Sequence, residues 1–298
     1  MTEALALEMN HVVKKRRRRT IGPINLQIPQ GYIVALVGSN GSGKSTILHL
    51  LTQSLIPDEG EIKWFGEKGS GGLPIEIKSK IAYVSENPVN EENYQTAEQA
   101  ASFRAHWYPA WDQKRFDRLM TRFDVPRKER LNRMSKGERR KFEVAAALAA
   151  SPKLLILDEL SSGLDPFAWK DMIEELQECM IGEDVTIIMA THIVEEVKRL
   201  ADYIVLVHQG EVLGMVEKDL LYGSCYEVWV RGDIAELKAS PGIIQYEEDE
   251  PAIHKLIVRD EAFIADLQQS AELQVLRSRA LELEEVLELW IKGNRPEY

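Results

Sequence analysis

Short apolar segments alternate with helix-like segments along the first two thirds of the chain. Tyr32–Val37, Leu154–Leu157 and Val185–Ala190 are apolar throughout, which is typical of strands that a parallel sheet buries on both faces. Between such segments the hydrophobic positions follow a helical spacing, most clearly in the alanine-rich stretch Lys141–Ala150. This alternation predicts an α/β body with a mainly parallel sheet. Further strands are expected at Ile81–Val84 and Tyr203–Val207, and further helices at Ile47–Leu51, Asp171–Cys179 and Glu195–Leu200.

Two regions depart from this alternation. Leu5–Met9 and Ile24–Ile28 alternate polar and apolar residues, so they predict two strands joined around the basic run Lys14–Arg19. The region of about residues 89–134 carries no strand signal, which indicates a helical insert. A glycine-rich stretch, Gly66–Gly72, is expected to form a loop. Helices of the insert are expected at Ala97–Arg104 and Gln113–Phe123.

The pattern changes near Gly214, where a region with strands and helices of its own begins. Its order of elements resembles a small split βαβ sandwich, so it predicts a separate α+β domain. We therefore expect two domains, one of residues 1–215 and one of residues 216–298. The second domain is expected to contain strands at Tyr226–Arg231, Ile243–Tyr246 and Lys255–Val258, and helices at Ile234–Ala239, Glu261–Leu267 and Leu281–Ile291.

The composition is that of a folded, acidic protein of 298 residues, with a formal net charge of −11 at pH 7. An acidic total argues against a broad nucleic-acid-binding surface, so we expect no nucleic-acid partner. From Glu217 onward 18 residues are acidic and 9 are basic, so the second domain holds most of the negative excess. Two cysteines fit a reducing compartment. No apolar run is long enough to span a bilayer, and the first ten residues lack a signal-peptide layout.

A phosphate-binding loop is indicated where the first buried strand ends. The sequence from Gly38 to Ser45 (GSNGSGKS) fits the pattern G-x-x-x-x-G-K-[ST]. Glycines there let backbone N–H groups curl around phosphate oxygens, and the helix that follows adds the positive end of its dipole. Lys44 can reach the β- and γ-phosphates, and the Ser45 hydroxyl can bind Mg²⁺. The predicted nucleotide-binding residues here are Gly38, Ser39, Asn40, Gly41, Ser42, Gly43, Lys44, Ser45 and Thr46.

Two acidic residues, Asp158 and Glu159, follow the apolar run LLIL. The carboxyl end of a buried parallel strand lies at the mouth of the sheet, where nucleotides bind. Asp158 is therefore a candidate ligand of Mg²⁺, directly or through water. Glu159 is a candidate general base or water-positioning residue. Taken alone, the pair also fits a strand that leads into an acidic turn.

With these motifs in this order, the chain resembles an ATP-binding cassette (ABC) ATPase. Ser135-Lys136-Gly137-Glu138 resembles the family's signature, whose serine and glycine contact phosphate. The family usually has glycine at the place of Lys136 and often glutamine at the place of Glu138. Read locally, Ser135 and Glu138 also form a capping box at the start of a helix. The resemblance covers about Leu5–Val216 and implies a P-loop NTPase cassette with a helical insert.

Three further positions carry the resemblance. Ser161–Asp165 (SSGLD) resembles the D-loop, which crosses between two subunits, and His192 resembles the switch histidine, which contacts the γ-phosphate. Glu86 falls where the family usually has the glutamine of its Q-loop, and a glutamate there could bind Mg²⁺ or water. The resemblance implies Lys44, Glu159 and His192 as catalytic residues, Ser45, Asp158 and Glu86 as metal ligands, and Ser135, Gly137, Glu138 and Asp165 as further nucleotide-binding residues.

The adenine-binding position departs from the family. The family stacks an aromatic side chain from the first hairpin on the base, but Lys14–Arg19 occupies that place with no aromatic nearby. A guanidinium plane can also stack on a base, so we expect one of Arg16–Arg18 to contact adenine, with Arg16 as the candidate. Two alternatives remain, a solvated basic turn and contact with anionic lipid.

The resemblance also implies a mechanism. Two cassettes face head to tail and hold ATP between Lys44 of one subunit and Ser135–Gly137 of the other. Because this chain has one cassette, it is expected to pair with a second copy of itself or with a related cassette. A separate transmembrane permease subunit is expected to dock near Glu86–Trp111. ATP and Mg²⁺ are the implied cofactors, and the chain is expected to be peripheral at the cytoplasmic face of a bacterial membrane.

The last helix-like segment favours an exporter. Leu281–Trp290 (LELEEVLELW), together with Glu86 and the sequence SKGE, resembles ATPases of bacterial exporters of peptide antibiotics or of amphipathic peptides such as phenol-soluble modulins. The aromatic stretch Ala101–Trp111 either fills the core of the insert or lines the docking groove. The second domain is expected to serve dimer contact or regulation, or only stability. The alternative function is a soluble cassette that acts on ribosomes or another macromolecular complex.

Overall fold

The computed structural model describes residues 4–17, 19–69, 72–88, 91–182, 184–250, 252–270 and 273–295. Arg18, one of the adenine candidates, and Val89, at the expected start of the helical insert, lie outside these ranges. The chain divides into two compact units, Met1–Met215 and Val216–Tyr298. No helix in the described ranges combines the length and the apolar character that crossing a bilayer requires.

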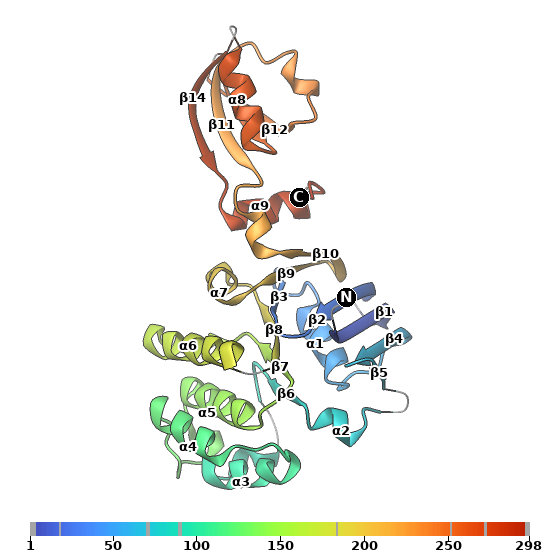
Figure 1. Cartoon of the computed structure of the whole chain (residues 1–298), viewed down its shortest axis with the longest axis vertical. Coiled ribbons are helices and arrows are strands. Elements are labelled where there is room, and N and C mark those ends of the chain that lie inside the picture. The colour runs from blue at the N-terminus through green and yellow to red at the C-terminus, as the bar shows by residue number, and fades with distance from the viewer. Residues whose placement is uncertain are drawn as a thin grey trace. The chain divides into compact units, whose positions relative to one another are not determined.

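A six-stranded sheet forms the centre of the first unit (Figure 1). Its strands, in spatial order, are β10 (Glu211–Glu217), β9 (Tyr203–His208), β3 (Ile33–Val37), β8 (Thr186–Thr191), β7 (Leu154–Asp158) and β6 (Ile81–Val84). The pairs β9–β3, β3–β8, β8–β7 and β7–β6 are parallel. Every residue of β3, β7 and β8 is buried, as the continuous apolar runs predict. The predicted parallel α/β body is therefore confirmed.

A second, antiparallel sheet has the order β2-β1-β4-β5. Its strands are β1 (Leu5–Lys15), β2 (Thr20–Pro29), β4 (Glu59–Trp64) and β5 (Glu67–Lys68). β1 and β2 form the expected hairpin around the basic residues. β5 lies within Gly66–Gly72, where the expectation of a loop is therefore wrong, and β4 was not expected. Only Ile62 and Trp64 of β4 are buried, so its hydrophobic pattern is too short to indicate a strand.

Helices cover the six-stranded sheet. Figure 1 shows α5, α6 and α7 along one side of it, with α1 and the antiparallel sheet along the other. The α-helices described in this unit are α1 (Lys44–Leu51), α2 (Ile75–Lys78), α3 (Ala97–Trp107), α4 (Gln113–Arg122), α5 (Lys136–Ala149), α6 (Pro166–Gly182) and α7 (Val194–Leu200), and its 3₁₀ turns are η1 (Glu91–Tyr94) and η2 (Leu131–Arg133). A further 3₁₀ turn, η3 (Lys218–Leu221), belongs to the second unit.

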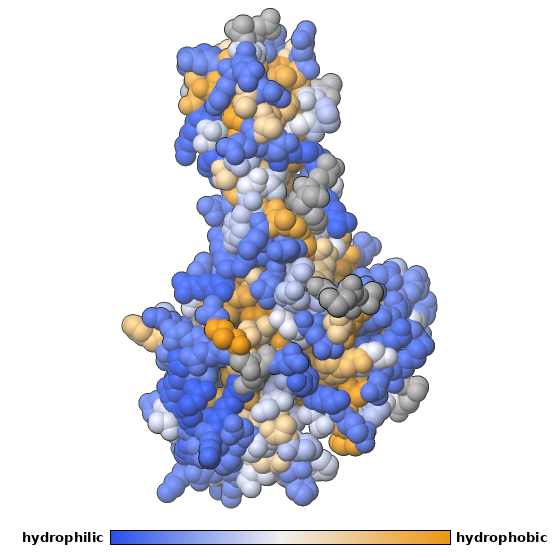
Figure 2. Space-filling view, in the orientation of Figure 1, coloured by the Kyte–Doolittle hydropathy of each residue, from blue (hydrophilic) through white to orange (hydrophobic). Residues whose placement is uncertain are grey.

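The predicted helical insert consists mainly of α3 and α4. Figure 2 shows a largely hydrophilic surface over this part of the visible face. Arg118 and Arg122 of α4 both pair with the buried carboxylate of Glu175 in α6, so the insert is anchored to the body. A buried charge pair of this kind fixes one arrangement, because removing either partner leaves an uncompensated charge.

The second unit contains a four-stranded antiparallel sheet in the order β12-β13-β11-β14. Its elements are β11 (Tyr226–Gly232), η4 (Leu237–Ala239), β12 (Ile243–Glu250), β13 (Ile253–Val258), α8 (Glu261–Gln269), β14 (Leu273–Ala280) and α9 (Leu283–Ile291). This is the order of a split βαβ fold, with a 3₁₀ turn in place of the expected first helix. β14 was not expected, because most of its side chains are exposed and its sequence lacks a continuous apolar face.

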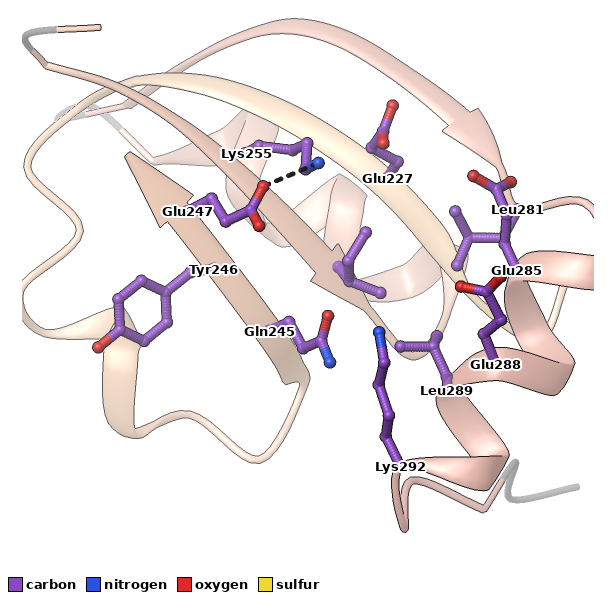
Figure 3. Close-up of a pocket in the computed structure, with 11 residues that line it drawn as sticks. Glu227, Gln245, Tyr246, Glu247, Lys255, Leu281, Glu285, Glu288, Leu289 and Lys292 are labelled. Carbon is purple, nitrogen blue, oxygen red and sulfur yellow. Dashed lines mark ion pairs between the residues drawn. The ribbon is translucent and has the colours of Figure 1, made fainter. Parts of the chain in front are cut away.

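A pocket of about 220 Å³ lies between this sheet and α9 (Figure 3). Lys255 pairs with Glu247 at its edge, with 2.9 Å between Nζ and Oε2. Arg279 binds the carboxylates of both Glu227 and Glu285. Most charges around the pocket are thus neutralised by one another, so it offers no strong site for a small ion.

Candidate functional site

The predicted phosphate loop connects β3 to α1. Gly43 is the N-cap of α1 and has φ 119°, a conformation that favours glycine. A Cβ on Gly38 would lie 2.1 Å from the Val207 carbonyl oxygen, so only glycine fits there. Both glycines are therefore required by the backbone path.

Lys44, the first residue of α1, is buried, and its ammonium lies under the loop. Nζ donates hydrogen bonds to the carbonyl oxygens of Gly38 at 2.7 Å and Ser39 at 3.3 Å. Its pKa is lowered by burial, and the nearby carboxylates of Asp158 and Glu159 oppose that shift. The loop thus encloses a positive charge, which is the requirement for binding phosphate oxygens.

Ser45 and Asp158 face each other across the ends of α1 and β7. The Ser45 Oγ lies 3.5 Å from Asp158 Oδ1. Burial raises the pKa of Asp158, and the charge of Glu86 raises it further. Magnesium prefers hard oxygen ligands at about 2.1 Å, so a hydroxyl and a carboxylate oxygen at this separation fit one such ion.

Glu159 and His192 meet because their strands, β7 and β8, are neighbours that end at the same edge of the sheet. His192 Nδ1 and Glu159 Oε2 are 2.8 Å apart, and Glu159 Oε1 lies 3.9 Å from Lys44 Nζ. Glu159 has φ 50°, a left-handed conformation that is uncommon outside glycine and is often found at functional sites. Burial raises its pKa, while His192 and Lys44 oppose that shift. The three predicted catalytic residues therefore lie together.

The signature segment forms the start of α5. The Ser135 hydroxyl accepts a hydrogen bond from the Glu138 N–H, and the Glu138 carboxylate accepts one from the Ser135 N–H at 2.7 Å. The second bond is the main reason why the pKa of Glu138 is lowered. The capping-box reading of the sequence is thus confirmed. Gly137 packs closely on the turn that follows β7, since a Cβ there would lie 2.8 Å from the Gly163 carbonyl oxygen.

Asp165 has a capping contact in this structure. Its Oδ1 accepts hydrogen bonds from the N–H groups of Phe167 at 2.9 Å and Ala168 at 3.0 Å, at the start of α6. These bonds, with the Ala168 bond first, lower its pKa. The carboxylate therefore stabilises the helix start directly.

Some basic side chains of the β1–β2 hairpin form ion pairs, and another is exposed to solvent. Lys14 pairs with Asp58 and Lys15 with Glu59, whereas Arg16 is exposed. The Arg19 side chain lies beside Gly210, with its Cδ 3.2 Å from the place of a Cβ on that glycine. Gly210 in turn donates a hydrogen bond to the Ser42 carbonyl oxygen at 2.8 Å. Arg19, which the sequence analysis did not single out, is thus close to the phosphate loop.

Arg140 is a second residue that sequence reasoning missed. This buried side chain of α5 donates hydrogen bonds to the carbonyl oxygens of Ser85, Glu86 and Asp158, at 3.0, 3.1 and 3.2 Å. It therefore ties the loop after β6 to the end of β7. The sequence signal was weak, because Arg140 stands between Arg139 and Lys141 in a run of charged residues.

The sequence and the fold of this chain are similar to those of known proteins. A family model described as "ABC transporter" matches residues 21–162. The energy-coupling factor transporter ATP-binding protein EcfA2 of Geobacillus kaustophilus is 32% identical over 222 residues, which are 70% of this chain and 76% of that protein. The bacitracin transport ATP-binding protein BcrA of Bacillus licheniformis is 28% identical over 206 residues, 68% of this chain and 67% of that one. A solved ATP-binding subunit of an ABC transporter superposes with a TM-score of 0.64 at 27% identity, covering 72% of this chain and 91% of that chain.

Proposed function

Because the chain belongs to the ABC transporter family of ATPases, we propose that it hydrolyses ATP to drive a separate membrane permease that exports peptides or antibiotics. The observation that carries the ATPase part is the convergence of Lys44, Glu159 and His192 at one edge of the parallel sheet. A buried cation beside a carboxylate and an imidazole suits phosphoryl transfer to water.

Each of these groups has a distinct role in the proposed reaction. The ammonium of Lys44 exchanges its loop carbonyls for the β- and γ-phosphates. Glu159 accepts a proton from, or orients, the attacking water. His192 holds the Glu159 carboxylate in place through their 2.8 Å contact and faces the γ-phosphate. Mg²⁺, held by Ser45 and Asp158 with Glu86 nearby, would neutralise the charge of the phosphate oxygens.

A head-to-tail dimer completes this site in our proposal. Ser135 and Gly137 lie at the start of α5, where N–H groups and the helix dipole favour an anion. The nucleotide on one subunit would be closed by this segment of a second copy or of a related cassette. Asp165 and the turn before it would lie at the same subunit contact.

Adenine recognition gives a testable prediction. We expect Arg16→Ala or Arg19→Ala to weaken ATP binding about tenfold, since a stacked guanidinium contributes roughly 1–2 kcal/mol. Lys15→Ala is the matched control, because its side chain pairs with Glu59. Fluorescent-nucleotide titration of the three variants measures the effect. Unchanged affinity in both arginine variants would mean that the base is bound without them.

A groove of about 540 Å³ supports the docking of a permease. It is lined by residues of the loop after β6 and by Phe103, Arg104 and Trp107 of α3. Phe103 is 50% exposed and Trp107 is 54% exposed, although large aromatic side chains are usually buried. Aromatic anchors of this kind carry much of the binding energy at protein interfaces.

The docking proposal is tested by purifying the tagged chain from its own cells in mild detergent and identifying the co-purifying proteins. A multi-span membrane protein is expected. Its recovery should fall at least tenfold in the Phe103→Ala, Trp107→Ala double variant, because each lost anchor costs about 1–2 kcal/mol. Ile181→Ala is the control, since that side chain is 89% exposed on α6. Recovery of ribosomes or of soluble partners alone would instead favour a cassette that acts without transport.

The proposal of a peptide or antibiotic cargo rests on the similarity of this chain to other transport ATPases. BcrA is named as a bacitracin transport protein, and the resemblance of Glu86 and SKGE to exporters of amphipathic peptides agrees with it. Other relatives carry names of different transport systems, including glycine betaine uptake. Reconstitution with the permease, followed by measurement of ATP hydrolysis with added bacitracin-like and amphipathic peptides, tests this part. Stimulation by glycine betaine alone would overturn it.

A further inference from the structure

Lys136 contacts two loops that lie on either side of the start of α5. Its Nζ donates a hydrogen bond to the Ser162 hydroxyl at 2.6 Å and lies 3.6 Å from Glu86 Oε1. Its aliphatic stem packs on Gly163, where an added Cβ would approach the Lys136 Cγ within 2.8 Å. One side chain thus connects the signature segment, the loop after β6 and the turn after β7.

Both residues of this ion pair are departures from the family pattern described above. Lys136 stands where a glycine is usual, and Glu86 stands where a glutamine is usual. Neither departure is adjacent to the other in the sequence, yet the structure brings their charged ends together. An acid and a base at contacting positions can balance each other's charge.

Glu86 lies in a part of the site that holds two further carboxylates, those of Asp158 and Glu159. Arg140 donates hydrogen bonds to the backbone carbonyl oxygens of both Glu86 and Asp158, at 3.1 and 3.2 Å, and Glu159 follows Asp158 directly in the chain. Arg140 binds the backbone carbonyl of Glu86 but does not pair with its carboxylate in the described contacts. Lys136 is therefore the cation that the structure places on this side chain.

We propose that Lys136 is a positioning residue that holds the Glu86 carboxylate and thereby sets how tightly the neighbouring acidic cluster accepts nucleotide with its metal. The inference rests on the proposed ATPase function. Without the lysine charge, Glu86 adds an unbalanced negative charge beside Asp158, which disfavours the phosphate groups of ATP. With glutamine at position 86, the same lysine has no charge to balance.

A double-mutant cycle tests this pairing. Affinity for Mg-ATP and for ATP in the presence of EDTA is measured for the wild type, Lys136→Gln, Glu86→Gln and the double variant. Lys136→Gln alone is expected to weaken Mg-ATP binding by up to about fivefold, as a partly exposed ion pair allows. In the Glu86→Gln background the same change is expected to have no effect. The loss of Mg-ATP affinity in Lys136→Gln should become smaller at high salt, because exposed charges are screened.

A matched control uses a pair outside the site. Lys170 and Glu174 of α6 lie 3.9 Å apart and are both exposed, and the same two neutral substitutions there should leave nucleotide affinity unchanged. If Lys136→Gln changed the affinity for Mg-ATP equally with glutamate and with glutamine at position 86, the proposed pairing would be overturned. A wild-type chain that binds no nucleotide would instead contradict the proposed function, so the two failures are distinguishable.

Discussion

Glu159→Gln is expected to lower the turnover of ATP by a factor of about 10²–10⁴ while ATP is still bound, because general-base catalysis contributes about that much. Glutamine has the shape of glutamate and can keep the contact with His192, but it cannot accept a proton from water. Bound ATP should then persist between two subunits, so the variant should accumulate as a dimer with ATP.

Three measurements check this outcome. Phosphate release gives the turnover, nucleotide titration gives the affinity, and size-exclusion chromatography with light scattering gives the oligomeric state. Glu195→Gln is the control, since Glu195 is an exposed acid three residues beyond His192 that pairs with Arg199. Turnover within a few fold of the wild type in Glu159→Gln would remove Glu159 from its proposed role.

Much of the site could be predicted because its residues stand at the ends of strands that the sequence itself predicts. The loop around Lys44 follows β3, Asp158 and Glu159 stand at the end of β7, and His192 follows β8, and all three strands are buried. Parallel neighbours bring their carboxyl ends to one edge, so the convergence follows from the strand pattern alone. The start of α5 was expected five residues too late because its first turn is polar, although the capping box at Ser135 marked it correctly.

The rest depended on contacts between segments far apart in the sequence. Arg140 lies just before the helix predicted at Lys141–Ala150, and only the fold places it against the carbonyl oxygen of Asp158. The pairing of Lys136 with Glu86 likewise has no local signal. The strands β10 and β14 have few buried residues, so hydrophobic alternation is weak in them. Tertiary pairing supplies their structure, and a single sequence does not display it.

Glu143→Ala is expected to destabilise the first unit by about 3–5 kcal/mol, the usual cost of leaving buried charges unpaired. The Glu143 carboxylate lies 2.7 Å from an Arg104 nitrogen and 2.7 Å from Arg139 Nε. Arg104 also pairs with Glu92 at 2.7 Å and stacks over the Phe142 ring. Removing the central acid takes away the carboxylate that the guanidinium groups of Arg104 and Arg139 share.

Denaturant unfolding of the wild type and the variant measures this loss from the shift in midpoint at constant slope. Glu174→Ala is the matched control. Glu174 also pairs with an arginine, Arg122, but its side chain is exposed, so a change of at most about 1 kcal/mol is expected. A loss of less than about 1 kcal/mol in Glu143→Ala would mean that the two arginines find other partners or water.

The same network predicts how the loss depends on pH. Burial alone would raise the pKa of Glu143, but Arg104 and Arg139 outweigh it and hold the pKa below the ordinary value. A carboxyl whose pKa is lower in the folded state stabilises the fold above its unfolded pKa of about 4.3, and this contribution is lost as the pH falls through the folded pKa. The difference between wild type and Glu143→Ala should therefore be constant near neutrality and decrease only in acid. A difference that decreased between pH 8 and pH 6 would point to another titrating group and contradict the assignment to Glu143.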